Sequence, residues 1–250
     1  MKVYENLAPY YDRFMDHIDY ENEAESIYRF LFEIDKRNGR VLDIGAGSGG
    51  HLLPLLKMGV KTDGLDYSEG MIDILRNKIR GKHLNARLYA ADMRDFETEQ
   101  TYDVIYCFGE TLHHLENIED AAAFLRCARR SLKDGGYLVF TWQESDYFYD
   151  LYDCGDFYDR HGDDYLLWNT ELNEEEVAAY LHYTAFVRGE EENSYHRIEE
   201  THRLAIFTEE EITDAVKETG FEFRNDLEDI CFSDHREEQP YKHITVLEKI

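Results

Sequence analysis

The sequence predicts an α/β fold, in which helices cover both faces of a doubly wound, mostly parallel sheet and an antiparallel β insertion follows the fifth strand. Between residues 41 and 142, short apolar runs alternate with helical patterns, which is typical of parallel strands joined by crossover helices. The first apolar run opens into a glycine-dense turn. Residues 165–207 read instead as three longer strands separated by short polar segments, which predicts an antiparallel meander.

Helices are expected on either side of this pattern. Before residue 40, four apolar residues recur at helical spacing and predict an amphipathic helix: Ile27, Phe30, Leu31 and Ile34. After the insertion, Thr208 and Glu211 form the capping-box pattern of a helix that Gly220 ends. Residues 221–224 and 243–248 are then expected to supply the closing strands of the core sheet.

The turn after the first strand points to a nucleotide cofactor. Gly45, Gly47 and Gly50 satisfy the Gly-x-Gly-x-x-Gly spacing of dinucleotide-binding folds, in which glycines let the backbone approach a ligand closely. Asp43 lies two residues before Gly45. Its carboxylate disfavours a diphosphate, because two anions would share a small desolvated crevice. It suits a ligand with an ammonium group, and S-adenosylmethionine has one and carries no phosphate.

Acidic residues also follow the second and third predicted strands. Asp66 ends the apolar run of residues 60–65 and is placed to accept hydrogen bonds from both ribose hydroxyls, a feature shared with NAD sites. Asp92 follows the strand expected at residues 86–90 and suits the amino group of adenine, with Met93 packed on the ring. These positions indicate an adenosine ligand without naming it.

Residues 41–142 resemble a class I S-adenosylmethionine-dependent methyltransferase. The resemblance is carried by positions that occur in the family's order: Asp43, Gly45, Gly47, Asp66, Asp92 and the turn Lys133-Asp134-Gly135-Gly136. Residues 4–20 are similar to the tyrosine-rich entry of small bacterial methyltransferases, which implies that this segment folds over the cofactor and brings Tyr10 or Tyr11 to it. The resemblance also implies a Rossmann-like sheet of seven strands, with S-adenosyl-L-methionine as the cofactor.

The motifs and the resemblance together define an expected cofactor site and domain plan. The expected cofactor-binding residues are Tyr11, Asp43, Gly45, Ala46, Gly47, Asp66, Tyr67, Met71, Asp92, Met93 and Phe108. Residues 1–142 are expected to form a helical lid and the cofactor-binding core, and residues 143–207 an antiparallel β insertion that covers the substrate site. Residues 208–250 are expected to complete the core with a helix and the closing strands.

The loop after the fourth strand, residues 109–115, is where a methyl acceptor is expected to bind. In-line methyl transfer depends mainly on holding the acceptor near the methyl carbon, and a base helps if the acceptor is an ammonium or a hydroxyl. By their position in the family, Glu110 and His113 are expected to face the methyl group as catalytic residues, whereas His114 is expected to anchor the loop. Adjacent histidines without a spaced third ligand are poor evidence for zinc, so no metal is expected.

The insertion is rich in aromatic and acidic residues. Most of its aromatic side chains are expected to pack within the added sheet, and Trp168, His182 and His202 are kept as pocket candidates. The segment is similar to an antiparallel sheet of small-molecule and sugar N-methyltransferases, where it roofs the substrate pocket or pairs subunits. A homodimer is therefore one of the two arrangements that the resemblance allows.

Composition limits the choice of partner. The formal net charge is −27, and a field of this sign opposes phosphate binding, so no nucleic acid is expected. The charge favours a small molecule or a protein side chain as the substrate, and the leading expectation is a small molecule. No apolar run has membrane-spanning length, and the first residues lack the apolar stretch of a signal peptide, which favours a cytoplasmic protein without a membrane partner. The four cysteines lack metal-type spacing and are interpreted as reduced thiols.

Three functions follow from these patterns. The leading one is methyl transfer by in-line displacement to a nitrogen or oxygen of a small molecule. An NAD-dependent oxidoreductase would reuse the glycine turn, but Asp43, the tyrosine-rich entry and the lack of a recognisable Tyr-x-x-x-Lys pair argue against it. A catalytically inactive S-adenosylmethionine-binding module stays open, because no single residue is obligatory for methyl transfer.

Overall fold

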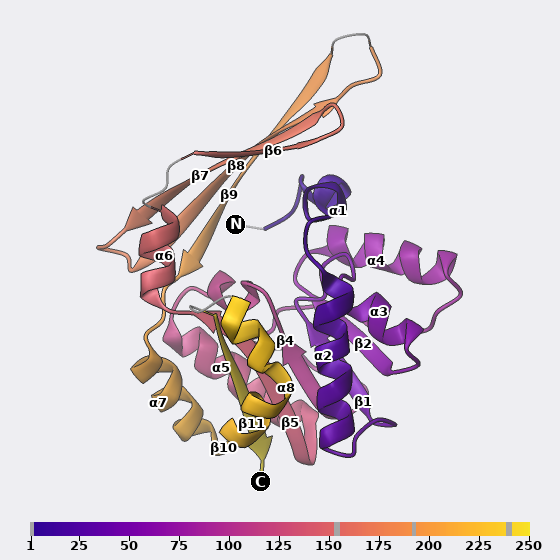
Figure 1. Ribbon diagram of the computed structural model, residues 1–250, viewed down its shortest axis with the longest axis vertical. Coiled ribbons are helices and arrows are strands. Elements are labelled where there is room, and N and C mark those ends of the chain that lie inside the picture. Colours follow the sequence, from indigo (N-terminus) through magenta and orange to yellow (C-terminus); the bar gives the residue numbers. More distant parts are fainter. Residues whose placement is uncertain (1–2, 153–155, 192–193, 239–241) are drawn as a thin grey trace.

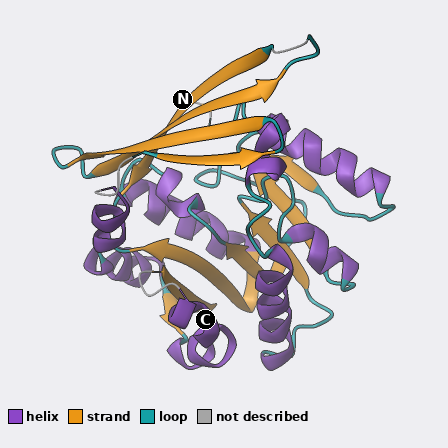
Figure 2. Ribbon diagram, turned by 45° about the horizontal axis from the view of Figure 1, so that its top comes forward, coloured by secondary structure: helices purple, strands orange, loops and turns teal. Residues whose placement is uncertain are grey.

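The protein has a large sheet enclosed by helices and a smaller sheet that lies across one end of it (Figure 1). The structure is a computed structural model that describes residues 3–152, 156–191, 194–238 and 242–250. Helices pack on both faces of the large sheet, whereas the small sheet extends outward beyond the core (Figure 2). Within these described ranges, no helix combines the length and apolarity needed to cross a bilayer.

The large sheet is parallel except at one edge, and its strand order is β10-β11-β5-β4-β1-β2-β3. The parallel strands are β1 (Arg40–Ile44), β2 (Lys61–Asp66), β3 (Leu88–Ala90), β4 (Tyr102–Cys107) and β5 (Leu132–Gln143). At the edge, β11 (Lys242–Lys249) pairs antiparallel with β5, and β10 (Phe221–Phe223) pairs antiparallel with β11. The predicted doubly wound, seven-stranded, mostly parallel sheet is confirmed.

The strand order reverses next to β1, so a crevice is expected outside the carboxyl ends of β1 and β4. The helices that surround the sheet are α2 (Tyr20–Glu33), α3 (Leu52–Lys57), α4 (Glu69–Gly81), α5 (Ile118–Ser131), α7 (Glu209–Thr219) and α8 (Asn225–Glu238). Side chains of α5 and α7 join one apolar cluster with the sheet, and side chains of α2 and α8 join another. The short helices η1 (Ala8–Tyr10) and α1 (Tyr11–Phe14) precede α2, and η2 (Thr111–His114) follows β4.

Local signals place the helix ends where the sequence predicts them. The Ser68 hydroxyl accepts the backbone N–H of Met71 at the start of α4 (3.3 Å). Thr208 and Glu211 form the predicted capping box of α7, and Gly220 ends that helix with a φ of 76°. Such left-handed backbone favours glycine, because a side chain there meets the neighbouring carbonyl.

The insertion has one strand more than the three that the sequence predicts. It comprises α6 (Ser145–Tyr152), β6 (Phe157–His161), β7 (Asp164–Asn173), β8 (Ala178–Arg188) and β9 (Tyr195–Ala205). The additional strand is β6, which the sequence does not indicate because it is short and largely exposed. Helix α8 was not predicted either, since Leu227, Cys231 and Phe232 are its few buried apolar side chains.

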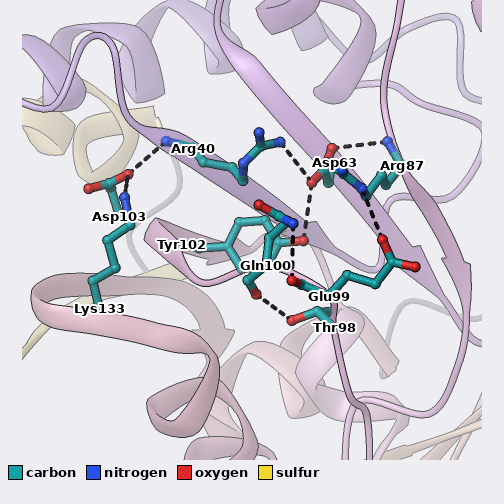
Figure 3. Close-up of polar contacts among 9 residues, drawn as sticks. All are labelled: Arg40, Asp63, Arg87, Thr98, Glu99, Gln100, Tyr102, Asp103 and Lys133. Atoms are coloured by element: carbon teal, nitrogen blue, oxygen red, sulfur yellow. Dashed lines mark hydrogen bonds and ion pairs between the residues drawn. The ribbon is translucent and has the colours of Figure 1, made fainter.

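Polar groups tie the amino ends of the strands together, opposite the crevice (Figure 3). Asp63 accepts hydrogen bonds from the backbone N–H of Arg87 (2.9 Å), the Tyr102 hydroxyl (3.2 Å) and the Arg40 guanidinium (3.3 Å). Asp103 accepts the backbone N–H of Arg40 (2.8 Å). Because Asp63 is only 3% exposed, its satisfied carboxylate fixes the register of β1, β2 and β4 at this end.

Candidate active site

The glycine turn lies at the carboxyl end of β1 and is held from both sides. Gly45 and Gly47 have φ angles of 76° and 52°, as the sequence predicts. The N–H of Gly45 donates to the carbonyl of Leu65 at the end of β2 (2.8 Å). A Cβ atom at Gly45 would lie 2.4 Å from the side chain of Thr111, so η2 packs directly on the turn.

Asp43 is a buried acid with a free acceptor atom. It is 1% exposed, and its Oδ2 has no hydrogen-bond partner among the described residues. Burial raises the pKa of this carboxyl from 3.8 to about 7, although the neighbouring His51 ring and Tyr106 hydroxyl act to lower it, and Asp66 raises it further. An unpartnered buried acceptor is unfavourable unless a ligand supplies a donor. The site therefore suits a ligand with a cationic N–H group.

Asp66 supplies a second carboxyl at the end of β2. Its oxygens accept the backbone N–H groups of Gly47 (2.7 Å) and Ser68 (2.8 Å). Burial raises its pKa, and these two hydrogen bonds oppose the rise. A carboxylate offers about four lone-pair sites. The remaining sites are free to accept hydrogen bonds from a ligand's hydroxyls, as predicted for the ribose.

Asp92 lies on the loop after β3 in an ion pair that sequence reasoning missed. Arg94 binds its carboxylate through Nε (3.0 Å) and Nη2 (2.7 Å), and reaches Asp120 of α5 through Nη1 (2.8 Å). Burial acts to raise the pKa of Asp92, but the hydrogen bonds from Arg94 hold it below the usual range. Met93 packs against the cluster on the α5 side of the sheet. Contact of Asp92 and Met93 with adenine stays a prediction.

Four further residues predicted to bind cofactor lie at different depths. Met71 is 1% exposed, Ala46 5%, Phe108 6% and Tyr67 50%. Phe108 continues β4 and packs in the cluster on the α2 and α8 side, so it borders the crevice from the opposite face to Met93. Tyr67 alone presents a large part of its ring to solvent. Their cofactor contacts also stay predictions.

The N-terminal segment folds onto the glycine turn, as the resemblance implies. Asp12 forms an ion pair with Lys78 of α4 (2.6 Å). Burial raises the pKa of Tyr11 well above its usual value, and its ring meets that of Tyr4 edge-on at 5.2 Å between centroids. Tyr10 instead packs into the apolar cluster beneath the insertion. Of the two tyrosines indicated by the sequence, Tyr11 is therefore the one that lies beside Tyr4 and interacts with Glu110.

Glu110 lies at the start of η2, next to acid–base groups from distant segments. Burial raises its pKa, opposed by a hydrogen bond from the Tyr147 hydroxyl (3.4 Å) and by the charge of Lys242. Lys242 also pairs with Glu23 (3.3 Å), whose other oxygen contacts His51 Nε2 (2.6 Å). The cluster of Glu23, His51 and Lys242 has no local signature, because its members are far apart along the chain.

The surroundings of His113 and His114 do not match the roles expected of these two residues. His113 is fully buried, with Nδ1 hydrogen-bonded to the carbonyl of Ala205 (2.7 Å) and Nε2 accepting the backbone N–H of Gln143 (2.9 Å). Burial lowers its pKa to about 4 against these two bonds. This geometry favours an anchoring role for His113 over the proton transfer expected from its position. His114, expected to be the anchor, has a buried Nδ1 with no partner within the described residues.

The three pocket candidates of the insertion occupy different places. His202 is 1% exposed, and its ring centroid lies 4.4 Å from that of Tyr4 and 5.5 Å from that of His114. His182 lies on the outer face of the sheet, 3.6 Å from Glu171, with 38% of its side chain exposed. Trp168 stacks on Phe157 at 5.5 Å between centroids. The structure therefore directs His202 toward the core, but not His182.

A family model described as "Methyltransferase domain" matches residues 11–225. The chain belongs to this methyltransferase family. A putative methyltransferase of Bacillus subtilis (strain 168) is 26% identical to this methyltransferase over 221 residues, which cover 88% of this chain and 87% of that protein. A dTDP-3-amino-3,6-dideoxy-alpha-D-glucopyranose N,N-dimethyltransferase of Streptomyces fradiae is 28% identical over 204 residues, with coverage of 81% and 77%. The solved structure of a sugar N-methyltransferase from Streptoalloteichus sp ATCC 53650 has a TM-score of 0.81 at 19% identity, covering 100% of this chain and 95% of that one.

The crevice of this methyltransferase fits S-adenosylmethionine, the cofactor predicted from the sequence. That cofactor is bound in the structure of an amino pentose methyltransferase from Micromonospora echinaspora, which has a TM-score of 0.73 at 21% identity and covers 100% of this chain and 98% of that one. In the present chain, the unpartnered Oδ2 of Asp43 matches an ammonium donor, and Asp66 keeps acceptor sites for hydroxyls. The glycines Gly45 and Gly47, both with left-handed backbone, let a ligand approach the main chain of the turn closely.

Proposed function

We propose that this methyltransferase transfers the methyl group of S-adenosylmethionine to an amino or hydroxyl group of a small molecule. The observation that carries the proposal is the buried carboxyl of Asp43, whose Oδ2 has no partner among the described residues. S-adenosylmethionine supplies an electrophilic methyl group on a sulfonium. In this assignment Asp43 accepts a hydrogen bond from the cofactor's ammonium, Asp66 accepts from its ribose and Tyr11 covers it.

Amines are the acceptors that the site favours most. The buried acid Asp43 and the half-buried acids Asp66 and Glu110 surround one crevice, and such a field attracts a cation. The related protein of Streptomyces fradiae is named as a dimethyltransferase of an amino sugar, which makes amino sugars the first acceptor class to test. Glu110 is assigned to binding the acceptor, because it is the acid at the N-terminal cap of η2. His113 is assigned to holding that loop in place.

Calorimetry tests the cofactor assignment. We expect S-adenosylmethionine to bind more tightly than NAD, and Asp43→Asn and Asp66→Ala to weaken that binding at least tenfold. Asp73→Ala is the matched control, because Asp73 lies on the exposed surface of α4 with 69% of its side chain accessible. Tighter binding of NAD, or wild-type affinity in both variants, would contradict the assignment. Turnover on a panel of amino sugars and hydroxyl analogues then separates an enzyme from an inactive binding module.

The remaining partner assignments are also proposals. We propose that the enzyme works in the cytoplasm, where its buried thiols Cys107, Cys127 and Cys231 stay reduced, and that it binds no nucleic acid, because its net charge is −27. We further propose a homodimer through the outer face of the insertion, where Tyr158, Leu167 and Tyr195 are exposed. Sedimentation equilibrium tests the dimer, localisation of a tagged protein tests the compartment, and retardation of RNA or DNA in a gel tests the exclusion.

A further inference from the structure

An unusual group of rings lies where η2, the insertion and the N-terminal segment meet. The ring centroid of His202 lies 4.4 Å from that of Tyr4, 5.1 Å from that of Tyr183 and 5.5 Å from that of His114. The Nδ1 atoms of His202 and His114 are both buried, and neither has a hydrogen-bond partner in the part of the chain that the structure describes. Two unsatisfied ring nitrogens in one place are unfavourable, and a polar ligand would relieve them.

Glu200 fixes the protonation of His202. Its Oε1 accepts the backbone N–H groups of Asn6 (2.5 Å) and Leu7 (3.0 Å), and its Oε2 lies 3.0 Å from His202 Nε2. Burial acts to raise the pKa of Glu200, but these hydrogen bonds hold it below the usual range, so the carboxylate is ionised. An ionised carboxylate can only accept hydrogen bonds. His202 Nε2 therefore carries a proton, and in the neutral ring Nδ1 is left as an acceptor.

The same rings border the methyl-transfer crevice. The side chain of Thr111 abuts Gly45 in the glycine turn. His114 follows three residues later in the 3₁₀-helix η2, and residues at this spacing lie on the same side of such a helix. Tyr4 also lies near the crevice, because its carbonyl accepts the Ser68 hydroxyl just after β2 (3.4 Å). His202 thus contacts two residues that face the cofactor loop.

The backbone of Tyr4 supports a functional reason for this arrangement. Its φ angle is 54°, in the left-handed region that a bulky side chain rarely adopts. Such strain persists only where surrounding contacts enforce it, and it gathers at ligand sites. Here the enforcing contacts include the edge-on ring contact with His202.

We propose that His202, oriented by Glu200, is the base that accepts a proton from the methyl acceptor through Nδ1; this inference rests on the proposed function. The acceptor's ammonium gives one proton to Nδ1, and its freed lone pair forms the new N–C bond. The S–C bond breaks as that bond forms, and its electron pair stays on sulfur. The imidazolium formed is stabilised by the carboxylate of Glu200 before the proton passes to solvent.

Four titratable groups face the ring of His202. They are Tyr4 from the N-terminal segment, His114 from η2, Tyr183 from β8 and Glu200 from its own strand. Burial, His202 and His113 lower the pKa of His114 to about 3, so that ring stays neutral. Glu200 does not touch the acceptor and is a positioning residue.

Steady-state kinetics on an amine acceptor test the assignment. Loss of a general base is expected to lower kcat about 100-fold or more in His202→Gln and to remove the acidic limb of its pH profile, with unchanged affinity for S-adenosylmethionine. His182→Gln is the matched control, because His182 also pairs with a glutamate but lies on the opposite face of the same sheet. A wild-type kcat and acidic limb in His202→Gln would overturn the proposal. The proposal would also be overturned if the acidic limb of the pH profile persisted in His202→Gln and vanished in Glu110→Gln.

A second measurement needs no acceptor. In ¹⁵N-histidine-labelled protein, two-dimensional NMR is expected to show His202 protonated at Nε2 in the wild type and a mixture of tautomers in Glu200→Gln. A wild-type ring protonated at Nδ1 overturns the assignment even if the enzyme methylates amines. Conversely, a wild-type protein that binds S-adenosylmethionine but methylates nothing contradicts the proposed function. The NMR spectrum then still shows which nitrogen of His202 carries the proton.

Discussion

Replacing Asp43 by asparagine should stabilise the cofactor-free enzyme while impairing its ability to bind the cofactor. Burial raises the pKa of this carboxyl from 3.8 to about 7, so the folded protein binds the proton more tightly than the unfolded chain. Between pH 3.8 and about pH 7 the free energy of unfolding therefore falls as the pH rises. A pKa difference of 1 corresponds to about 1.4 kcal/mol, so the buried charge costs up to roughly 4 kcal/mol at pH 8. Asparagine keeps the shape and removes that charge.

Urea unfolding at pH 5 and pH 8 measures this effect. The free energy of unfolding of Asp43→Asn, relative to that of the wild type, should rise by up to about 3 kcal/mol from pH 5 to pH 8, since most of the titration of Asp43 lies between these values. Asp103→Asn is the contrast: burial acts to raise the pKa of Asp103, but Lys133 and the Arg40 N–H lower it, so this variant should be the less stable one at pH 8. An Asp43→Asn protein that loses stability from pH 5 to pH 8 relative to the wild type would refute the reasoning.

Four other outcomes are expected. Cofactor affinity, measured by calorimetry, should fall by up to about tenfold per pH unit below pH 7, as Asp43 becomes protonated. Gly45→Ala should lower the free energy of unfolding in urea by about 2 kcal/mol and weaken cofactor binding, because its Cβ would meet Thr111 in a strained backbone. His113→Ala should lower the free energy of unfolding by about 3 kcal/mol, because two buried backbone groups lose their partner. In the same variant, limited proteolysis should cut the insertion faster than in the wild type. Asp63→Ala should lower the free energy of unfolding by about 2 kcal/mol with cofactor affinity unchanged, since Asp63 lies at the opposite end of the sheet.

The core fold was predictable because its signals are local. An apolar strand followed by an acid and glycines identifies β1 and its turn, and the cap residues Ser68, Thr208 and Gly220 fix helix ends through contacts within a few residues. Helix α8 and strand β6 gave no such signal, since few of their side chains are buried and their stability comes from tertiary contacts.

The site was predictable only in part, for a related reason. Asp43 and Asp66 could be recognised from their distance to the glycine turn. The difference between His113 and His114 could not, because it depends on Gln143 and Ala205, which arrive from other parts of the chain. Adjacent residues on a 3₁₀ turn point in different directions, and the sequence does not say which direction meets the insertion.

The link through His113 has a consequence for how substrate choice can change. One ring joins the loop that carries Glu110 to the last residue of β5 and the last residue of β9. The added sheet and the loop after β4 are therefore mechanically coupled, and any displacement of the added sheet is transmitted to the loop that carries Glu110. Diversification of acceptors in relatives with this link should proceed through side-chain replacement on the inner face of the sheet rather than through its repositioning.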